Sequence, residues 1–316
     1  MTDVDLRSSA ASPSGIAELD RVLGGGVVPG AVILLAGEPG VGKSTLLLQV
    51  VASVAARGTR ALYVTGEESV EQVRARAERV GSVSPEVFIA AESEVSAVVS
   101  HVEQVAPSLM VIDSIQTMTS AGVDGVVSGV SQVREATSAL IRLAKERDMA
   151  CIVVGHVTKD GGIAGPRTLE HLVDVVLSFE GDRHARLRMV RAVKNRYGPT
   201  DEVGCFELGD AGLTGLADPS GLFVSDRTEP VPGTCVTVAL EGRRPLLAEI
   251  QALVVPAAGS VPRRTTSGMD SARIAMVLAV LERREAVALS RLDTYIAPVG
   301  GARRVEPACD AAVALA

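Results

Sequence analysis

One nine-residue segment constrains the fold of this chain more than any other. Residues 37–45 read GEPGVGKST, directly after the apolar run 31–36 and directly before a helical pattern at 43–57. They match G-x-x-x-x-G-K-S/T, in which glycines let backbone N–H groups surround phosphate oxygens while the helix N-terminus adds positive charge. The segment predicts a phosphate-binding loop between a strand and a helix. A glycine-rich turn that binds no nucleotide is the alternative.

This loop gives roles to individual residues. Lys43 is expected to reach the β- and γ-phosphates as a catalytic cation, and the hydroxyl of Ser44 to ligate Mg²⁺. ATP and Mg²⁺ are therefore the predicted cofactors, and ATP hydrolysis is the predicted chemistry. The residues expected to contact the nucleotide are Gly37, Glu38, Pro39, Gly40, Val41, Gly42, Lys43, Ser44 and Thr45.

Short apolar runs alternate with longer helical patterns over the first two thirds of the chain. This order is typical of an α/β fold with a mostly parallel central sheet flanked by helices. Hydrophobic residues make up 47% of the chain and aromatic residues only 2%, so a core of Ala, Val, Leu and Ile is expected. Strands are expected at 31–36, 61–65, 87–90, 109–112, 151–154, 174–179 and 186–193, and helices at 43–57, 69–80, 94–106 and 130–148.

The length of 316 residues suits about two domains. A stretch rich in Gly, Pro and Asp at 209–234 indicates a boundary, and we expect domains at 1–222 and 223–316. In the second domain, the patterns predict strands at 235–240 and 246–255 and a helix at 271–288. The chain stops within a new helical pattern at 306–316, so this domain is expected to be incomplete.

Acidic residues follow two of the predicted strands. Asp113 ends the run LMVID and is expected to hold Mg²⁺ through water, with a turn or capping residue as the alternative. Glu67 and Glu68 follow the strand at 61–65, and one of them is expected to orient or deprotonate the attacking water. Glu67 is the first choice and Glu68 the second. The alternative is a solvated acid pair at a helix start.

A histidine and a glycine-rich loop follow the strand at 151–154. His156 is predicted to sense the γ-phosphate through a hydrogen bond, unless it is an ordinary polar residue with satisfied partners. The loop 157–168 contains Lys159 and Arg167 among glycines, which suits contact with a DNA phosphate backbone. An unremarkable mobile surface loop is the alternative.

Charge and composition restrict the other function classes. The formal net charge is −7, which argues against a surface that binds nucleic acid everywhere. One local stretch is basic and free of acids, with Arg183, Arg186, Arg188, Arg191, Lys194 and Arg196. The four cysteines form no C-x-x-C pair, so neither zinc nor a disulfide framework is expected. No apolar run is long enough to cross a bilayer and no secretory signal is recognisable, so a cytoplasmic protein without membrane contact is expected.

In this order, the motifs resemble the RecA-type ATPases, and the fuller resemblance is to the bacterial RadA (Sms) family of DNA-repair proteins. It runs from about residue 14 to the C-terminus. The diagnostic strings are GEPGVGKSTLLLQ at 37–49, YVTGEES at 63–69, VIDSIQT at 111–117, GHVTKDGGIAGPRTLEHLVDVVLSFEGD at 155–182 and KNRYG at 194–198. In the family the last of these strings is usually KNRFG, and here Tyr197 stands in place of the Phe.

The resemblance implies a RecA-like core that forms a homo-hexameric ring, with ATP sites between subunits and single-stranded or branched DNA in the channel. Lys194 and Arg196 would then act on the neighbouring subunit's nucleotide, as an arginine finger does. Lys159 and Arg167 would lie in the channel loop. The family also implies DNA repair, recombination, branch migration and a recombinase partner such as RecA. Without the resemblance, 194–198 reads as a solvated basic turn.

The chain departs from the family pattern at both ends. Family members carry a four-cysteine zinc finger before the ATPase domain, whereas the first cysteine here is Cys151. They also end in a complete α+β domain resembling the Lon protease domain, of which this chain has the beginning, from about residue 230. We therefore expect a shortened form, and infer none of the functions that belong to the finger.

Two other function classes compete with a DNA motor. One is an ATP-switched oligomeric scaffold resembling the circadian-clock ATPase KaiC, which shares the paired glutamates. KNRYG and the loop at 157–168 favour the motor, and stimulation of the ATPase by DNA would separate the two. The other is peptidase activity in the Lon-like segment. Lys194 is the last lysine, so no Ser–Lys pair can form within 230–316.

Overall fold

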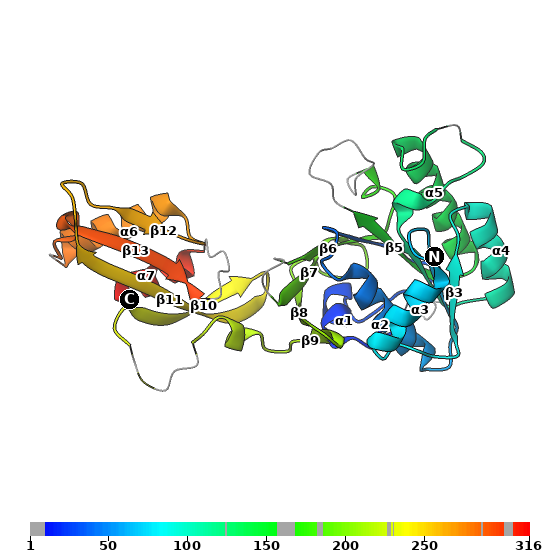
Figure 1. Cartoon of the computed structure of the whole chain (residues 1–316), viewed down its shortest axis with the longest axis horizontal. Coiled ribbons are helices and arrows are strands. Elements are labelled where there is room, and N and C mark those ends of the chain that lie inside the picture. Colours follow the sequence, from blue (N-terminus) through cyan, green and yellow to red (C-terminus); the bar gives the residue numbers. More distant parts are fainter. Residues whose placement is uncertain are drawn as a thin grey trace, which may run out of the picture. The chain divides into compact units, whose positions relative to one another are not determined.

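The computed structural model describes residues 10–123, 125–156, 168–181, 186–225, 229, 231–285, 287–299 and 306–316. The chain divides into two compact units, Met1–Ala217 and Asp218–Ala316. In Figure 1 the first unit runs from blue to yellow-green and the second from there to red. The division falls slightly before the boundary predicted at residue 222.

Within its described residues, the first unit contains a nine-stranded sheet in the order β3-β2-β4-β5-β1-β6-β7-β8-β9. The strands from β3 to β6 in this order are parallel, and the last three are antiparallel. The predicted mostly parallel sheet is therefore confirmed. The strands are β1 (Val32–Gly37), β2 (Ala61–Thr65), β3 (Val87–Ala91), β4 (Leu109–Asp113), β5 (Ala150–His156), β6 (Val175–Glu180), β7 (Leu187–Asn195), β8 (Val203–Gly209) and β9 (Gly212–Gly215).

Helices cover both faces of this sheet (Figure 1). Helices α1 (Ala17–Leu23), α2 (Lys43–Ala55) and α3 (Val70–Arg79) pack on one face, and α4 (Val95–Val105) and α5 (Val130–Glu146) on the other. Along β1, Ile33 and Leu35 face the first group while Val32 and Leu34 face the second. Because both faces are buried, the strands read as continuous apolar runs, which is why the sequence reveals them.

Aliphatic side chains fill most of the core, as expected. Three aromatic residues are nevertheless among the largest fully buried side chains: Tyr63, Phe179 and Phe206. The rings of Phe179 and Phe206 meet edge to face, with centroids 6.4 Å apart. The core prediction is wrong for these positions, and Tyr63 is important for the site described below.

Three elements of the first unit have no clear signal in the sequence, namely α1, β8 and β9. Strands β8 and β9 form a hairpin that turns between Gly209 and Gly212, where Gly212 has a φ of +111°. The Gly and Asp residues that suggest a linker from residue 209 therefore form a tight turn. The start of that stretch belongs to the sheet.

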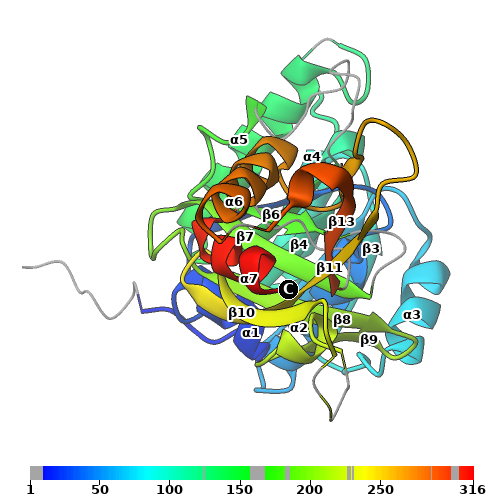
Figure 2. The same cartoon turned by 90° about the vertical axis from the view of Figure 1, so that its left-hand side faces the viewer.

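The described part of the second unit forms a four-stranded sheet in the order β10-β11-β13-β12. Helices α6 and α7 pack on one face of this sheet, around Ile250, Ile274 and Leu278 (Figure 2). On the strand β10, Val236 and Val238 remain about half exposed. The elements are β10 (Thr234–Glu241), β11 (Arg244–Pro256), β12 (Arg264–Thr266), α6 (Ser271–Arg284), β13 (Leu292–Pro298) and α7 (Asp310–Leu315). Among the described residues of the whole chain, no helix combines the length and apolarity needed to cross a membrane.

Candidate active site at the carboxyl edge of the sheet

Four neighbouring strands bring the predicted motifs to one edge of the sheet. The order β2-β4-β5-β1 places their carboxyl ends side by side. The carboxyl ends of paired strands are in register, because Thr65 lies opposite Asp113 and Gly37 lies opposite His156. In sheets of this kind, ligands bind outside the carboxyl ends of the strands. The residues that follow these four strands therefore meet where a ligand is expected.

The phosphate-binding loop depends on glycine at both ends. A side chain at Gly37 would collide with the backbone carbonyl of Phe179 on β6. Gly42 has a φ of +113°, which L-residues rarely adopt, and a Cβ there would lie 3.3 Å from Leu213 on β9. Steric contact therefore requires glycine at both consensus positions. Phe179 of β6 and Leu213 of β9 form the wall behind the loop.

The lysine of this loop, Lys43, is held by the loop itself. Lys43 is only 4% exposed, and its Nζ donates to the carbonyl oxygens of Gly37 (2.8 Å) and Glu38 (2.9 Å). Burial lowers the pKa of Lys43, and the negative charges of Asp113 and Glu67 oppose that shift. The ammonium group therefore lies where phosphate oxygens are expected, in the field of two carboxylates.

The predicted magnesium ligand Asp113 is held by a residue of the neighbouring strand. Asp113 is 7% exposed and accepts a hydrogen bond from the phenol of Tyr63 on β2 (Oη to Oδ2, 2.5 Å). Sequence analysis gives Tyr63 no role, because its contact depends on the pairing of β2 with β4.

The donor atoms at this place suit Mg²⁺. The Ser44 hydroxyl and the Asp113 carboxylate are hard oxygen ligands, and Mg²⁺ usually takes few protein ligands together with phosphates and water. Across the described ranges, no cluster of three or more His, Cys, Asp or Glu side chains could hold a metal ion. The residues present therefore fit an ion that is shared with a nucleotide.

Glu67 lies at the centre of the polar cluster. Its carboxylate accepts a hydrogen bond from the hydroxyl of Ser114 and lies 3.0 Å from Nε2 of His156. The hydrogen bond with His156, helped by that from Ser114, lowers the pKa of Glu67 to about 2 although burial opposes the shift. Gly66 permits this approach, because a Cβ there would collide with the side chain of Thr117.

The neighbouring acid, Glu68, has a different environment. Its carboxylate forms an ion pair with Arg76 of α3. Glu67 instead contacts Ser114 and His156, which belong to the ends of β4 and β5. The geometry favours Glu67 of the two glutamates, while its catalytic role stays a prediction.

Two buried polar atoms at this edge have no hydrogen-bond partner within the described part of the chain. They are Nδ1 of His156 and Oε1 of Gln116. The Nε2 of Gln116 also donates to the carbonyl of His156 (3.4 Å). Because buried polar atoms are normally paired, these two mark a place where a ligand or water can bind. Gln116 and Ser114 belong to the string VIDSIQT, yet neither is identified from the sequence as a site residue.

Arg188 supports the phosphate-binding loop from behind. It is only 4% exposed, and its Nε donates to the carbonyl oxygen of Val41 (3.0 Å). On the same strand, Arg191 forms an ion pair with Glu180 (3.4 Å). The described part of this stretch, residues 186–196, therefore does not form one exposed basic strip, because strand alternation directs Arg188 into the core.

The KNRYG segment begins in the last two residues of β7. The Nζ of Lys194 donates to the carbonyl oxygens of Glu170 (2.8 Å) and Val173 (2.7 Å). Arg196 pairs with Asp174, at 3.2 Å between Nη1 and Oδ1. Both cations are thus anchored within their own chain, and their action on a neighbour's nucleotide stays a prediction. Lys159 and Arg167 lie outside the described residues.

A pocket of about 550 Å³ adjoins the end of the phosphate-binding loop. Thr45 lines it together with Arg79, Leu208 and Asp210. This mixture of apolar and polar groups beside the loop suits the remainder of a nucleotide.

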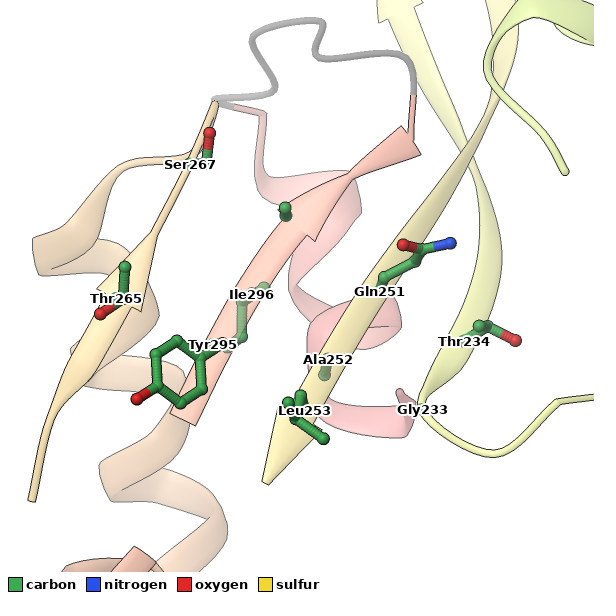
Figure 3. A pocket seen from close by; sticks show the side chains of 10 residues that line it. Gly233, Thr234, Gln251, Ala252, Leu253, Thr265, Ser267, Tyr295 and Ile296 are labelled. Atoms are coloured by element: carbon green, nitrogen blue, oxygen red, sulfur yellow. The ribbon is translucent and has the colours of Figure 1, made fainter. Parts of the chain in front are cut away.

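The second unit has a pocket of its own, of about 410 Å³, on the sheet (Figure 3). Tyr295 of β13, Gln251 and Leu253 of β11 and Thr265 of β12 are among its lining residues. None of the lining residues is acidic or basic. Among the described residues, this lining offers no cation for a phosphate and no base beside its hydroxyl groups, and we assign the chemistry to the first unit.

Comparisons with known proteins show which family this chain resembles. A family model described as "AAA domain" matches residues 4–162. The chain is 56% identical over 315 residues to "DNA repair protein RadA" of Mycobacterium tuberculosis (strain ATCC 25618 / H37Rv), which covers 99% of this chain and 66% of that relative. The protein of the same name from Streptococcus pyogenes serotype M1 is 48% identical over 316 residues, covering 100% of this chain and 70% of that relative. The chain thus spans about two thirds of the length of these relatives.

Proposed function

Since this chain belongs to the RadA family of bacterial DNA-repair proteins, we propose that it is a DNA-dependent ATPase that processes recombination intermediates and promotes branch migration. One observation carries the ATPase part: the phosphate-binding loop, Asp113 and the Glu67–His156 pair meet at one edge of the sheet. The DNA part is supported by the name of the relatives and by the KNRYG string.

Each group at this edge has a part in the proposed reaction. Lys43 stabilises the negative charge that develops on the transferred phosphoryl group. Ser44 and Asp113 would hold Mg²⁺, which would offset negative charge on the phosphates. His156 senses the γ-phosphate from the end of the adjacent strand β5.

The low pKa of Glu67 favours one of its two possible roles. A carboxylate with a pKa of about 2 is ionised at neutral pH but is a poor acceptor for a proton from water. Phosphoryl transfer passes through a loose transition state in most analyses, which makes little demand on early proton removal. Glu67 therefore acts mainly by orienting the attacking water, and His156 fixes the position of its carboxylate.

The proposal includes a ring of six subunits. Lys194 and Arg196 then complete the neighbour's ATP site, and Lys159 and Arg167 contact DNA phosphates in the channel. Cations that contact phosphates without reading bases suit an enzyme that moves along DNA of any sequence. A recombinase such as RecA is the proposed protein partner, and the cytoplasm, which holds the chromosome, is the proposed location.

We also propose which domain each part of the chain forms. The ATPase domain is assigned to about residues 1–222, and residues 223–316 to a Lon-protease-like domain. Support for the latter is its α+β organisation, with α6 and α7 on one face of a mixed sheet. No peptidase activity is assigned to it.

The proposal is tested by measuring the ATPase rate and the oligomeric state with and without single-stranded DNA. Faster hydrolysis with DNA, together with a ring-sized species, is expected. ATP hydrolysis that DNA does not stimulate would instead favour the KaiC-like scaffold, which the DNA-repair relatives do not favour. Absence of hydrolysis by a ring that binds ATP and DNA would contradict the motor.

A further inference from the structure

A hydroxyl group lies where an aliphatic core does not require one. Tyr63 is in the middle of β2, between Leu62 and Val64, and is only 1% exposed. A phenylalanine would fill the same apolar space, but a buried phenol must find a hydrogen-bond partner. Its partner is one oxygen of Asp113 (2.5 Å), the residue assigned to Mg²⁺.

Strand pairing explains why these two side chains meet. Tyr63 lies opposite Val111 on β4, and Thr65 lies opposite Asp113. Residues two apart on a strand share a face, so Tyr63 and Asp113 lie on the same face of neighbouring strands. This is the face covered by α2, because Tyr63 and Val111 pack in the same core cluster as Leu46 and Leu47. The phenol is therefore directed towards the N-terminus of α2, where Ser44 is located.

The phenol donates this hydrogen bond and the carboxylate of Asp113 accepts it. Tyr63 therefore contacts the residue assigned to the metal ion from within the buried core.

We propose that Tyr63 is a positioning residue for Mg²⁺, because its hydroxyl donates to Oδ2 of Asp113 and so fixes how this ligand faces the ion. The inference rests on the proposed ATPase function. Tyr63 itself binds neither ion nor nucleotide. Its effect should therefore appear in metal affinity more than in affinity for the nucleotide alone.

Tyr63→Phe tests this, since it removes a single oxygen atom. A fluorescent ATP analogue is titrated into the full chain in EDTA and then at increasing Mg²⁺, and Mn²⁺ binding is followed by electron paramagnetic resonance. Loss of a group that orients a metal ligand typically weakens metal binding about 10- to 100-fold. We expect Tyr63→Phe to need about 10-fold more Mg²⁺, with unchanged binding in EDTA and recovery of hydrolysis at saturating Mg²⁺.

Tyr295→Phe is the matched control, because it removes the same atom from the second unit and should leave the Mg²⁺ dependence unchanged. Asp113→Asn provides a second background. If Tyr63 acts through Asp113, adding Tyr63→Phe to Asp113→Asn should cause little further loss of metal affinity. Additive losses in the double variant would overturn the proposed route.

Thermal unfolding of the same samples separates a structural role from a positioning role. A lower melting temperature combined with the wild-type Mg²⁺ dependence would show that Tyr63 only stabilises the core, and would overturn the inference. If the wild-type chain itself shows no Mg²⁺-dependent nucleotide binding, the proposed function fails and the inference fails with it. That outcome is recognised from the wild type alone.

Discussion

The imidazole Nε2 of His156 lies 3.0 Å from the carboxylate Oε1 of Glu67, although the two residues follow different strands and are far apart in the sequence. This contact is the principal cause of the low pKa of Glu67. It also links the predicted γ-phosphate sensor directly to the predicted water-orienting group. Substitution of either residue should therefore alter the environment of the other.

Glu67→Gln should retain nucleotide binding and lower the hydrolysis rate by about 100-fold or more, because a neutral amide orients water less well than a carboxylate. Single-turnover hydrolysis and fluorescent-nucleotide binding measure the two effects separately. Glu68→Gln is the matched control, since Glu68 pairs with Arg76. A large loss in Glu68→Gln with little loss in Glu67→Gln would reverse the assignment.

The low pKa of Glu67 makes the stability of the chain depend on pH. Its pKa falls from an ordinary 4.5 to about 2 on folding, so ionised Glu67 favours the folded state. This contribution is fully present above about pH 4.5 and is lost as the pH falls towards 2. The stability of wild type relative to Glu67→Gln should therefore decrease on acidification, as measured by urea unfolding between pH 6 and pH 3. His156→Ala should remove most of this pH dependence, and a constant difference across the range would contradict the assigned shift.

Lys43→Ala should lower ATP hydrolysis by at least about 100-fold, because it removes the ammonium group that lies where the phosphate oxygens are expected. Steady-state phosphate release measures this loss. Lys145→Ala, on an exposed position of α5, is the matched control and should hydrolyse ATP normally. Near-normal turnover in Lys43→Ala would contradict the ATPase mechanism.

Lys194→Ala should bind ATP through its own intact loop yet hydrolyse it poorly even with DNA, if Lys194 serves the neighbouring subunit. Mixing it with Lys43→Ala gives a direct test, since some seams of a mixed ring regain both lysines. Hydrolysis should then partly return. If mixed rings form but hydrolysis never exceeds that of either variant alone, the action across the seam is wrong.

Changing Lys159 and Arg167 together to Ala should weaken binding to unrelated single-stranded DNAs by similar factors. Each lost phosphate contact should reduce the slope of log affinity against log salt by about 0.7 for single strands. Fluorescence anisotropy at several salt concentrations measures both quantities. Arg142→Ala, exposed on α5, is the control. An unchanged affinity and slope would assign the DNA contact to another surface.

The sequence predicts an element of the fold when the local residue pattern reflects the place of that element in the structure. The parallel strands are buried on both faces, so each appears as an apolar run, and the phosphate-binding loop has fixed letters for steric reasons at Gly37 and Gly42. Glu67 is predictable because it follows such a strand. Tyr63 and Arg188 are not, because each acts through a partner on a distant segment whose proximity depends on strand pairing. The hairpin of β8 and β9 is missed because its turn residues are also those of a linker.

The residues that pack behind the phosphate-binding loop limit how far this chain can be shortened without changing the shape of the loop. Phe179, Arg188 and Leu213 all approach the loop, and all follow residue 162, where the match to the AAA domain ends. A fragment cut near that residue would keep every consensus letter of the loop. It would lose the guanidinium that binds the Val41 carbonyl and the side chains that pack against both glycines. The smallest fragment expected to keep the loop in its present shape therefore extends through β9, to Gly215.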